Sequence, residues 1–405
     1  MKVLHLCTGF PLSFNGGITN YVRALIISQR AIGYDVAVVA MEEESVDGFD
    51  VIPFSSDNVK PFSRNFDFQG ASDQRILQII EQEKPDLIHV HMVLDFSAST
   101  FECIQASGIP YCVSLHDYYY ICPRIIMVKA DDTVCRTMED NKCKRCVGPV
   151  GKNKSLKRLL PSVMLDALGM LGGNVVERAE AMRCFLANAA MLFPVSKRVE
   201  EIYRDFSPDG RYHTLHIGNQ SALSFPPVRE RSGPIIVAAL GSLTYHKGAG
   251  VLQELLARVN SSEVIFHFYG RANREWMKKL SALGLQDCGE YKPGQLGEIL
   301  RNVDVGLVLP IWEDNGPQVT MEFINHRVPV VGTRRGGIPD FIGENNGYVF
   351  EPDSSTEVEG AVSFIRELDR ENLLRIKEGM TPLLSPDEHA KALSLYYDEI
   401  TGGVE

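Results

Sequence analysis

Short apolar runs alternate with amphipathic segments along most of the chain, a pattern typical of parallel strands joined by helices. In the first half, the apolar runs predict strands over residues 2–8, 35–41, 84–92, 111–115 and 190–195. Helical periodicity predicts helices over residues 20–31, 73–83, 98–107, 152–183 and 197–206. This alternation predicts an α/β fold with a doubly wound parallel sheet.

The second half repeats this architecture. Its predicted strands are residues 235–241, 264–269, 303–310 and 328–331, with an edge strand within 345–352. Its predicted helices are residues 251–259, 276–283, 295–301, 317–326, 355–369 and 386–400, with another that starts after the glycine pair in 336–342. Residues 207–234, between the halves, are rich in Pro, Gly and Ser, which is typical of an interdomain region. We therefore expect domains over 1–215 and 234–385, with a C-terminal helix in 386–405 that can pack back on the first domain.

One stretch of the second half has the pattern of an anion site. An apolar run, residues 303–310, is followed by the polar loop Trp312–Gly316 and by a helix with Pro317 at its first position. The free N–H groups and the dipole of such a helix point toward the loop. Gln318 and Glu322 are four residues apart and share one helix face, where a carboxylate can bind both hydroxyls of a ribose. The pattern favours a nucleotide-sugar site, although an ordinary solvated helix face has the same spacing.

Other candidate residues lie in loops that follow predicted strands. Gly16 and Gly17 precede a helix without the G-x-G-x-x-G spacing, so they indicate either a close backbone approach or simple turn chemistry. His116 ends a strand, where an α/β sheet places its ligands, although a buried core histidine is the alternative. Lys247 precedes a helix and can add a cation to a phosphate site.

Four of the nine cysteines lie within 25 residues of a polar, turn-rich insert at about 121–150. They are Cys122, Cys135, Cys143 and Cys146, separated by 12, 7 and 2 residues and ending in a C-x-x-C. Thiolates at such spacing can hold a structural Zn²⁺, although no standard zinc ribbon has these intervals. A zinc site, a redox-labile disulfide and buried thiols all remain open.

Composition narrows the class of protein. The length of 405 residues suits two domains, and a net charge of −11 argues against a nucleic-acid partner. No apolar run is long enough to span a membrane, and the first residues read as a strand rather than a signal peptide. Scattered cysteines fit a reducing cytoplasm. The basic segment that begins at 152 can rest on an anionic membrane surface or, alternatively, pack on the sheet.

These motifs together resemble the GT-B glycosyltransferases, and the retaining glycosyltransferase family 4 (glycosyl transferases group 1) in particular. The resemblance rests on the glycine pair, the LHD of 115–117, the HKG of 246–248, and an E-x7-E-like pattern ending at Glu322, followed by NHRVPVVGTRRGG. It implies two Rossmann-like domains facing a central cleft. It also implies a hexosyltransferase that takes a UDP-, GDP- or ADP-sugar without a metal. The implied acceptor is a polysaccharide or lipid-linked glycan of bacterial surface glycan synthesis.

The resemblance also implies residue roles. Glu322 would hold the donor ribose, and Lys247 the diphosphate, while His116 would lie near the anomeric centre and the sugar hydroxyls. With Asp314 in the first acidic position of the motif, the implied catalytic set is His116, Asp314 and Glu322. The implied donor-binding residues are Gly16, Gly17, Lys247, Arg271, Tyr291, Gln318, Val319 and Glu322.

Three positions depart from the family pattern. Asp314, preceded by Glu313, replaces the first glutamate, and Ser242 replaces a frequent arginine. His326 stands where glycine is common. Arg271, Arg334 or Arg335 can replace the missing arginine. The alternatives are a sugar phosphorylase, a UDP-sugar epimerase, a non-catalytic partner of the same fold, and a zinc-dependent module built on the cysteines.

Overall fold

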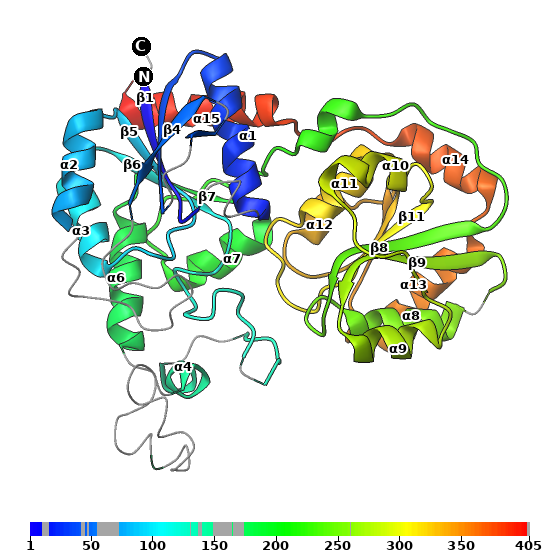
Figure 1. Ribbon diagram of the computed structural model, residues 1–405. Coiled ribbons are helices and arrows are strands. Elements are labelled where there is room, and N and C mark those ends of the chain that lie inside the picture. The colour runs from blue at the N-terminus through cyan, green and yellow to red at the C-terminus, as the bar shows by residue number, and fades with distance from the viewer. Residues whose placement is uncertain are drawn as a thin grey trace. The chain divides into compact units, whose positions relative to one another are not determined.

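The computed structural model describes residues 1–9, 16–41, 45–46, 48–54, 73–129, 131–136, 140–148, 164, 174–259 and 261–402. The chain divides into two compact units. The first unit comprises Met1–Ile217 and Pro386–Glu405, and the second comprises Gly218–Ser385. Each unit has its own sheet between helices (Figure 1), and the doubly wound α/β class is confirmed.

The sheet of the first unit has the order β3-β4-β2-β1-β5-β6-β7. The strands are β1 Lys2–Leu6, β2 Asp35–Ala40, β3 Ser45–Val46, β4 Phe49–Pro53, β5 Leu87–Val90, β6 Tyr111–Leu115 and β7 Met191–Pro194. All neighbours pair in parallel except β3, which is antiparallel to β4. The strands β3 and β4 are absent from the predicted set. Because β1 lies between β2 and β5, the carboxyl ends of β1 and β5 lie at the point where strand order reverses.

The helices of the first unit are α1 Gly17–Ala31, α2 Asp73–Glu83, α3 Ala98–Ala106, α4 Asp140–Val147, α6 Val175–Ala187, α7 Lys197–Phe206 and α15 Pro386–Thr401. α1 and α15 pack on each other, so the end of the chain completes the first unit (Figure 1). The C-x-x-C of the insert lies on the helix α4 rather than in a turn. Most of the predicted helix 152–183 lies outside the described residues, and α6 begins at Val175.

The second unit has an all-parallel sheet of order β10-β9-β8-β11-β12-β13. Its strands are β8 Ile235–Leu243, β9 Val264–Ala272, β10 Gln286–Asp287, β11 Val305–Val308, β12 Val330–Thr333 and β13 Gly347–Phe350. β8 and β9 continue past their predicted ends, so Ser242 and Arg271 lie opposite each other in the ladder. Arg271 is therefore a strand residue, although it lies beyond the end of the predicted strand 264–269.

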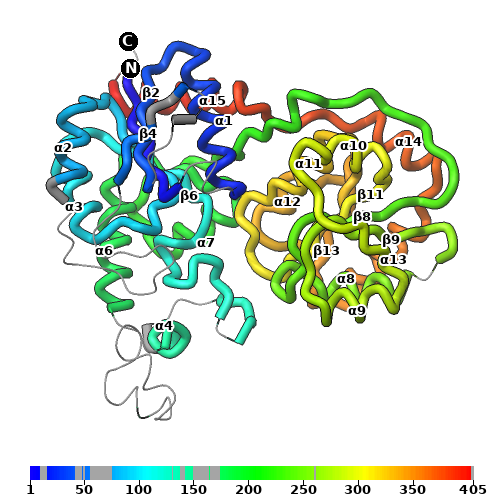
Figure 2. Tube along the Cα trace, viewed as in Figure 1, coloured from blue at the N-terminus to red at the C-terminus, as the bar shows by residue number. Residues whose placement is uncertain are grey.

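The helices of the second unit are α8 Ala249–Val259, α9 Arg274–Ser281, α10 Leu296–Leu300, α11 Gln318–Asn325, α12 Ile338–Phe341, α13 Ser355–Glu367 and α14 Arg370–Gly379. Helices α8, α9 and α13 lie on one face of the sheet, and α10, α11 and α12 on the other (Figure 2). The helix α14 is absent from the predicted set, and two short 3₁₀ helices add to these elements, Gln220–Ser224 and Pro293–Gln295.

A buried carboxylate ties the ends of the second unit to its central strands. The side chain of Asp304, just before β11, is fully buried and lies 3.0 Å from Arg231, 2.8 Å from Arg370 and 3.3 Å from Lys377. It also accepts a 3.0 Å hydrogen bond from the N–H of Ile236 on β8. One carboxylate thus joins the segment before β8, two central strands and α14.

We expect Asp304→Ala to lower the free energy of unfolding of the second unit by roughly 3–5 kcal/mol, because the change leaves one buried and two partly buried cations without their partner. Both tryptophans, Trp276 and Trp312, belong to this unit, so urea unfolding followed by their fluorescence reports on it alone. Glu378→Ala, an exposed change on the same helix α14, is the control. Equal midpoints for the two variants would contradict this role for Asp304.

Candidate functional site

The candidate donor site begins where β11 leads into α11. Pro317 is the N-cap residue of α11, and the helix starts at Gln318, one residue later than predicted. Within the helix, the backbone N–H groups of Gln318 and Val319 have no preceding carbonyl to bond, as in the first turn of any helix. They lie beside the acidic loop at the carboxyl end of β11. The local geometry is that of an anion-binding helix start.

Glu322 lies one turn into α11 and is partly buried. Burial raises the pKa of its carboxyl to about 7. Burial also raises the pKa of Tyr291 to about 12, and the Glu322 charge adds to that rise, so the two side chains share one neighbourhood. His326 donates from Nδ1 to the Glu322 carbonyl (2.8 Å) at the end of α11. Among the described residues, no side chain forms an ion pair with the Glu322 carboxylate.

Lys247 and Asp314 meet at the same edge of the sheet. Lys247 Nζ lies 2.7 Å from Asp314 Oδ2 and 4.8 Å from the ring centroid of Trp312. The next residue, Gly248, has φ +90°, and a Cβ there would lie 1.8 Å from the Leu309 carbonyl oxygen. Only glycine fits this approach, so the sequence Lys-Gly fixes the lysine beside the acidic loop.

The glycine pair after β12 packs on the other side of that loop. Gly337 N–H donates to the Asp314 carbonyl (2.8 Å), and Gly336 N–H donates to Glu313 Oε2 (2.8 Å). Gly336 has φ +52°, and a Cβ there would lie 1.9 Å from the Asp314 carbonyl oxygen. The adjacent acids therefore differ in their contacts, because Glu313 binds backbone while Asp314 binds Lys247.

The three arginines considered for the missing cation have different surroundings. Arg335 is buried and pairs with Glu351 and Asp353. Arg334 pairs with Glu357 at 3.1 Å. Arg271 is exposed and pairs with Glu290 at 2.6 Å. Arg271 and Arg334 are thus both accessible, and the side chain of Arg271 is the more exposed of the two, at 79% against 53%.

Sequence reasoning missed three buried polar groups near this loop. Among the described residues, no hydrogen-bond partner reaches Trp312 Nε1, Thr320 Oγ1 or either side-chain polar atom of Asn315. Leaving a buried amide unpaired costs roughly 1–3 kcal/mol, so such groups are suited to ligand hydroxyls or ordered water. An Asn before Gly has the composition of an ordinary turn, so the sequence carries no signal of this burial.

In the first unit, the glycine pair and His116 come together through α1. Gly16 N–H donates to Thr19 Oγ1 (2.9 Å) and caps α1. Tyr21, one turn further, has its ring centroid 4.8 Å from that of His116 at the end of β6. The carboxyl end of β6 and the start of α1 are therefore neighbours. His116 is partly buried, and burial lowers its pKa to about 3, so its ring is neutral near pH 7.

A chain of hydrogen bonds connects His116 to the core. Gln29 Nε2 donates to the Tyr397 hydroxyl (3.1 Å), so Gln29 Oε1 accepts from His5 Nε2 (2.8 Å). The neutral His5 ring then accepts at Nδ1 from His91 Nε2 (2.9 Å). His91 in turn accepts at Nδ1 from His116 Nε2 (3.2 Å). The chain assigns His116 its Nε2–H tautomer and leaves Nδ1 as an acceptor.

His5, His89 and His91 form the one group of three potential metal ligands within 4.8 Å among the described residues. All six of their ring nitrogens already have hydrogen-bond partners, because His89 binds Tyr397 and Ser114. Burial lowers the pKa of all three rings. The group is therefore a hydrogen-bonded support for His116. The four cysteines of the insert line a separate cavity.

The fold, with two doubly wound units and charged loops at strand ends, is that of the GT-B glycosyltransferases. Residues 15–141 match the model of Glycosyltransferase Family 4, and residues 234–367 match the model of Glycosyl transferases group 1. The two matches together span more than half of the chain, which belongs to this glycosyltransferase family. In the part of the chain that the structure describes, no helix has the length and apolar character needed to span a bilayer.

Named relatives agree with this family. The chain is 24% identical over 377 residues to the sulfoquinovosyl transferase SQD2 of Arabidopsis thaliana, covering 89% of this chain and 66% of SQD2. The fold is similar to Anabaena HepE in complex with UDP and glucose (TM-score 0.63, 12% identity, 98% and 99% of the two chains). It is also similar to the catalytic domain of Arabidopsis thaliana starch synthase IV bound to ADP and acarbose (TM-score 0.62, 12% identity, 99% of both chains).

We expect Glu322→Gln to stabilise the second unit above pH 7. The folded carboxyl has a pKa near 7, above its ordinary 4.5, so the free energy of unfolding falls as pH rises through that window. The glutamine side chain does not titrate, so Glu322→Gln removes this loss of at most about 3 kcal/mol in the free energy of unfolding. The difference between the variant and the parent should vanish near pH 4.5. Tryptophan fluorescence during urea unfolding at several pH values measures it. Glu344→Gln, at an exposed position, is the control, and a pH-independent difference would contradict the assignment.

We also expect Gln29→Met to release the tautomer of His116, because His5 loses the acceptor that orders the chain. Nitrogen-15 NMR of histidine-labelled protein near pH 7 should show His116 as the Nε2–H form in the parent and as a mixture in Gln29→Met. Gln29→Glu retains an acceptor for His5 and should retain the parent pattern. His116→Gln identifies the signals. A His116 spectrum that is the same in Gln29→Met would disprove the chain.

Proposed function

We propose that this glycosyltransferase is a retaining enzyme that moves a sugar from a nucleoside-diphosphate sugar to an acceptor hydroxyl. The observation that carries the proposal is Glu322, a partly buried carboxylate with no cationic partner among the described residues, one turn inside α11. A carboxylate in that place can accept hydrogen bonds from both ribose hydroxyls, which would compensate its burial. Tyr291 lies in the same neighbourhood and is proposed to contact the base.

The diphosphate is proposed to bind at the start of α11. Lys247 supplies a positive charge, and the backbone N–H groups of Gln318 and Val319 supply hydrogen bonds. Lys247 is paired with Asp314 before a ligand binds, so the leaving diphosphate would compete for a lysine that is already positioned. Arg271 is the proposed second cation. Gly16 and Gly17, at the start of α1, are proposed to let the donor approach the backbone closely.

Transfer is proposed to pass through an oxocarbenium-like state as the nucleoside diphosphate leaves. Neutralising the charge that develops on the leaving group is the main contribution of such a site. Asp314 is proposed to accept a hydrogen bond from one hydroxyl of the transferred sugar. His116 is proposed to accept a hydrogen bond from a second hydroxyl at Nδ1, which its neutral Nε2–H tautomer leaves as an acceptor. No glycosyl-enzyme is proposed, because no carboxylate pair of the described residues stands out as nucleophile and acid.

For the donor we propose only that it is a nucleotide sugar, and for the acceptor we propose only a class of molecule. HepE carries UDP in its complex and starch synthase IV carries ADP, so the relatives support a nucleotide donor and leave its base open. For the acceptor we propose a polysaccharide or lipid-linked glycan, used on the cytoplasmic side of a membrane. The basic residues from 152 onward, which lie outside the described part of the chain, are proposed to contact anionic lipid.

The donor site is tested by thermal unfolding with UDP, GDP, ADP and their sugars. A nucleotide at a hundredfold excess over its Kd should stabilise the protein by about 2.7 kcal/mol, which corresponds to a rise in Tm of a few degrees. Glu322→Ala and Lys247→Ala should lose that rise and their transferase turnover. Lys279→Ala, which changes a surface lysine paired with Glu275, should keep both.

Protection by no nucleotide, or protection that survives Glu322→Ala, would overturn the donor site. A product that forms only with inorganic phosphate would favour a phosphorylase. The configuration of the new glycosidic bond, read by proton NMR of the product, decides whether transfer is retaining.

A further inference from the structure

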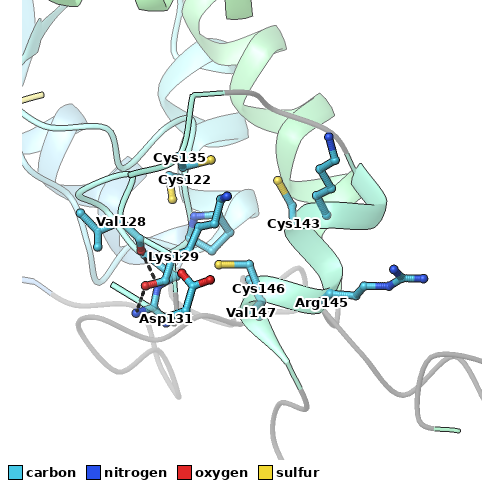
Figure 3. Close-up of a pocket in the computed structure, with 12 residues that line it drawn as sticks. Cys122, Val128, Lys129, Asp131, Cys135, Cys143, Arg145, Cys146 and Val147 are labelled. Carbon is cyan, nitrogen blue, oxygen red and sulfur yellow. Dashed lines mark hydrogen bonds between the residues drawn. The ribbon is translucent and has the colours of Figure 1, made fainter. Parts of the chain in front are cut away.

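The cysteine-rich insert forms a second site, separate from the candidate donor site. Four cysteines line one cavity of about 350 Å³, together with Pro123, Val128 and Val147. They are Cys122, Cys135, Cys143 and Cys146. They come from three segments: the turn that follows β6, a short hairpin and the helix α4. Four residues of one reactive type, separated in sequence, are thus collected around a single space (Figure 3).

Backbone hydrogen bonds hold the first two cysteines in place. Cys122 N–H donates to the Tyr118 carbonyl (2.7 Å), and the Cys122 carbonyl accepts from Ile125 N–H (2.8 Å). Cys135 N–H donates to the Met127 carbonyl (2.7 Å) at the end of a hairpin closed by the Val128–Val134 bridge. These bonds fix the backbone that carries both sulfurs.

The other two cysteines lie three residues apart on α4 and therefore share one helix face. Figure 3 shows Cys143 and Cys146 extending from α4 to the side on which Cys122 and Cys135 lie. All nine cysteines of the chain lie among the described residues, and none of them forms a disulfide. None of the four sulfurs is thus held in a disulfide, and a metal would bind them as thiolates.

Charge around the cavity complements an anionic centre. A divalent ion with four thiolates carries a net charge of about −2. Arg124, Lys129, Lys142 and Arg145 line the same cavity, and Asp131 is the one acidic residue in the described part of its lining. A single carboxylate is a poor site for hard cations such as Mg²⁺ or Ca²⁺, which need several oxygen ligands. Four sulfurs select thiophilic metals instead.

We propose that Cys122, Cys135, Cys143 and Cys146 bind one tetrathiolate metal centre that fastens α4 to the turn after β6. The centre supports the segment that follows His116, because Tyr118 N–H donates to the Ile125 carbonyl (3.0 Å) within the same turn. The helix α4 has little apolar contact of its own, since Val147 is its one buried residue within its described side chains. A metal bond replaces the missing core in such segments.

Two metals satisfy this ligand chemistry. Among the described residues, no three cysteine sulfurs lie within 4.8 Å of one another. The sulfurs around one Zn²⁺, with Zn–S bonds of about 2.3 Å, are closer together than that. A single zinc ion therefore requires the side chains to rotate inward. An iron–sulfur cluster, also held by four thiolates, is larger and holds its ligands further apart.

The test is metal analysis of the full chain purified under reducing conditions without oxygen. About one zinc per chain, or iron with matching acid-labile sulfide and visible absorption, is the expected result, and the two arms identify the metal. The double variant Cys143→Ser/Cys146→Ser should lose more than nine-tenths of that metal. The matched control, Cys184→Ser/Cys288→Ser, changes two exposed cysteines outside the cavity and should keep it.

A second measurement uses the parent protein, so its result does not depend on whether the double variant folds. Cobalt(II) added to metal-stripped parent protein should give the intense visible spectrum of tetrahedral thiolate coordination at one ion per chain. Absence of bound metal together with a featureless cobalt titration would overturn the proposal, as would full metal retention in the double variant. Nucleotide protection, measured in parallel, depends on the second unit, so failure of the metal site and failure of the donor site are distinguishable.

Discussion

Two glycine-only contacts between backbones hold the loops of the second unit in register. Gly248 lies against the Leu309 carbonyl and Gly336 against the Asp314 carbonyl, each too close for any Cβ. The loops after β8, β11 and β12 are thereby packed main chain to main chain at one edge of the sheet. The close packing leaves little freedom to Lys247, Asp314 and the start of α11. Positioning of this kind is what charge stabilisation requires, because the groups need not reorganise when charge develops.

Four carboxylates within one short stretch have different environments. Asp304 is buried and neutralised by three cations, Glu313 accepts a backbone N–H, and Asp314 pairs with Lys247. Glu322 has none of these partners, and burial raises its pKa to about 7. A group that is desolvated without compensation reduces stability, which makes Glu322 the candidate among the four for a contact with a ligand. The distinction comes from the fold, since the four side chains have similar chemistry.

The strands and helices that the sequence predicts well are those with a long apolar run or a clear helical period, such as β1, β11 and α1. The elements it misses include the strands β3, β4 and β10 and the helices α4 and α14. The acidic helix and the Lys-Gly loop were identifiable because their chemistry is local. The burial of Asn315 and the chain from Gln29 to His116 were not, since both depend on residues brought together only by the fold.

The last helix shows how far that dependence extends. Tyr397, on α15, accepts from Gln29 and contacts His89, while His389 on the same helix bonds to the Tyr21 hydroxyl at 2.7 Å. Tyr21 in turn packs against His116. The orientation of Gln29, and with it the tautomer of His116, therefore depends on residues near the opposite end of the chain. His116 is thus supported by the packing of α15 within the first unit, so we expect changes at Tyr397 or His389 to alter His116 indirectly.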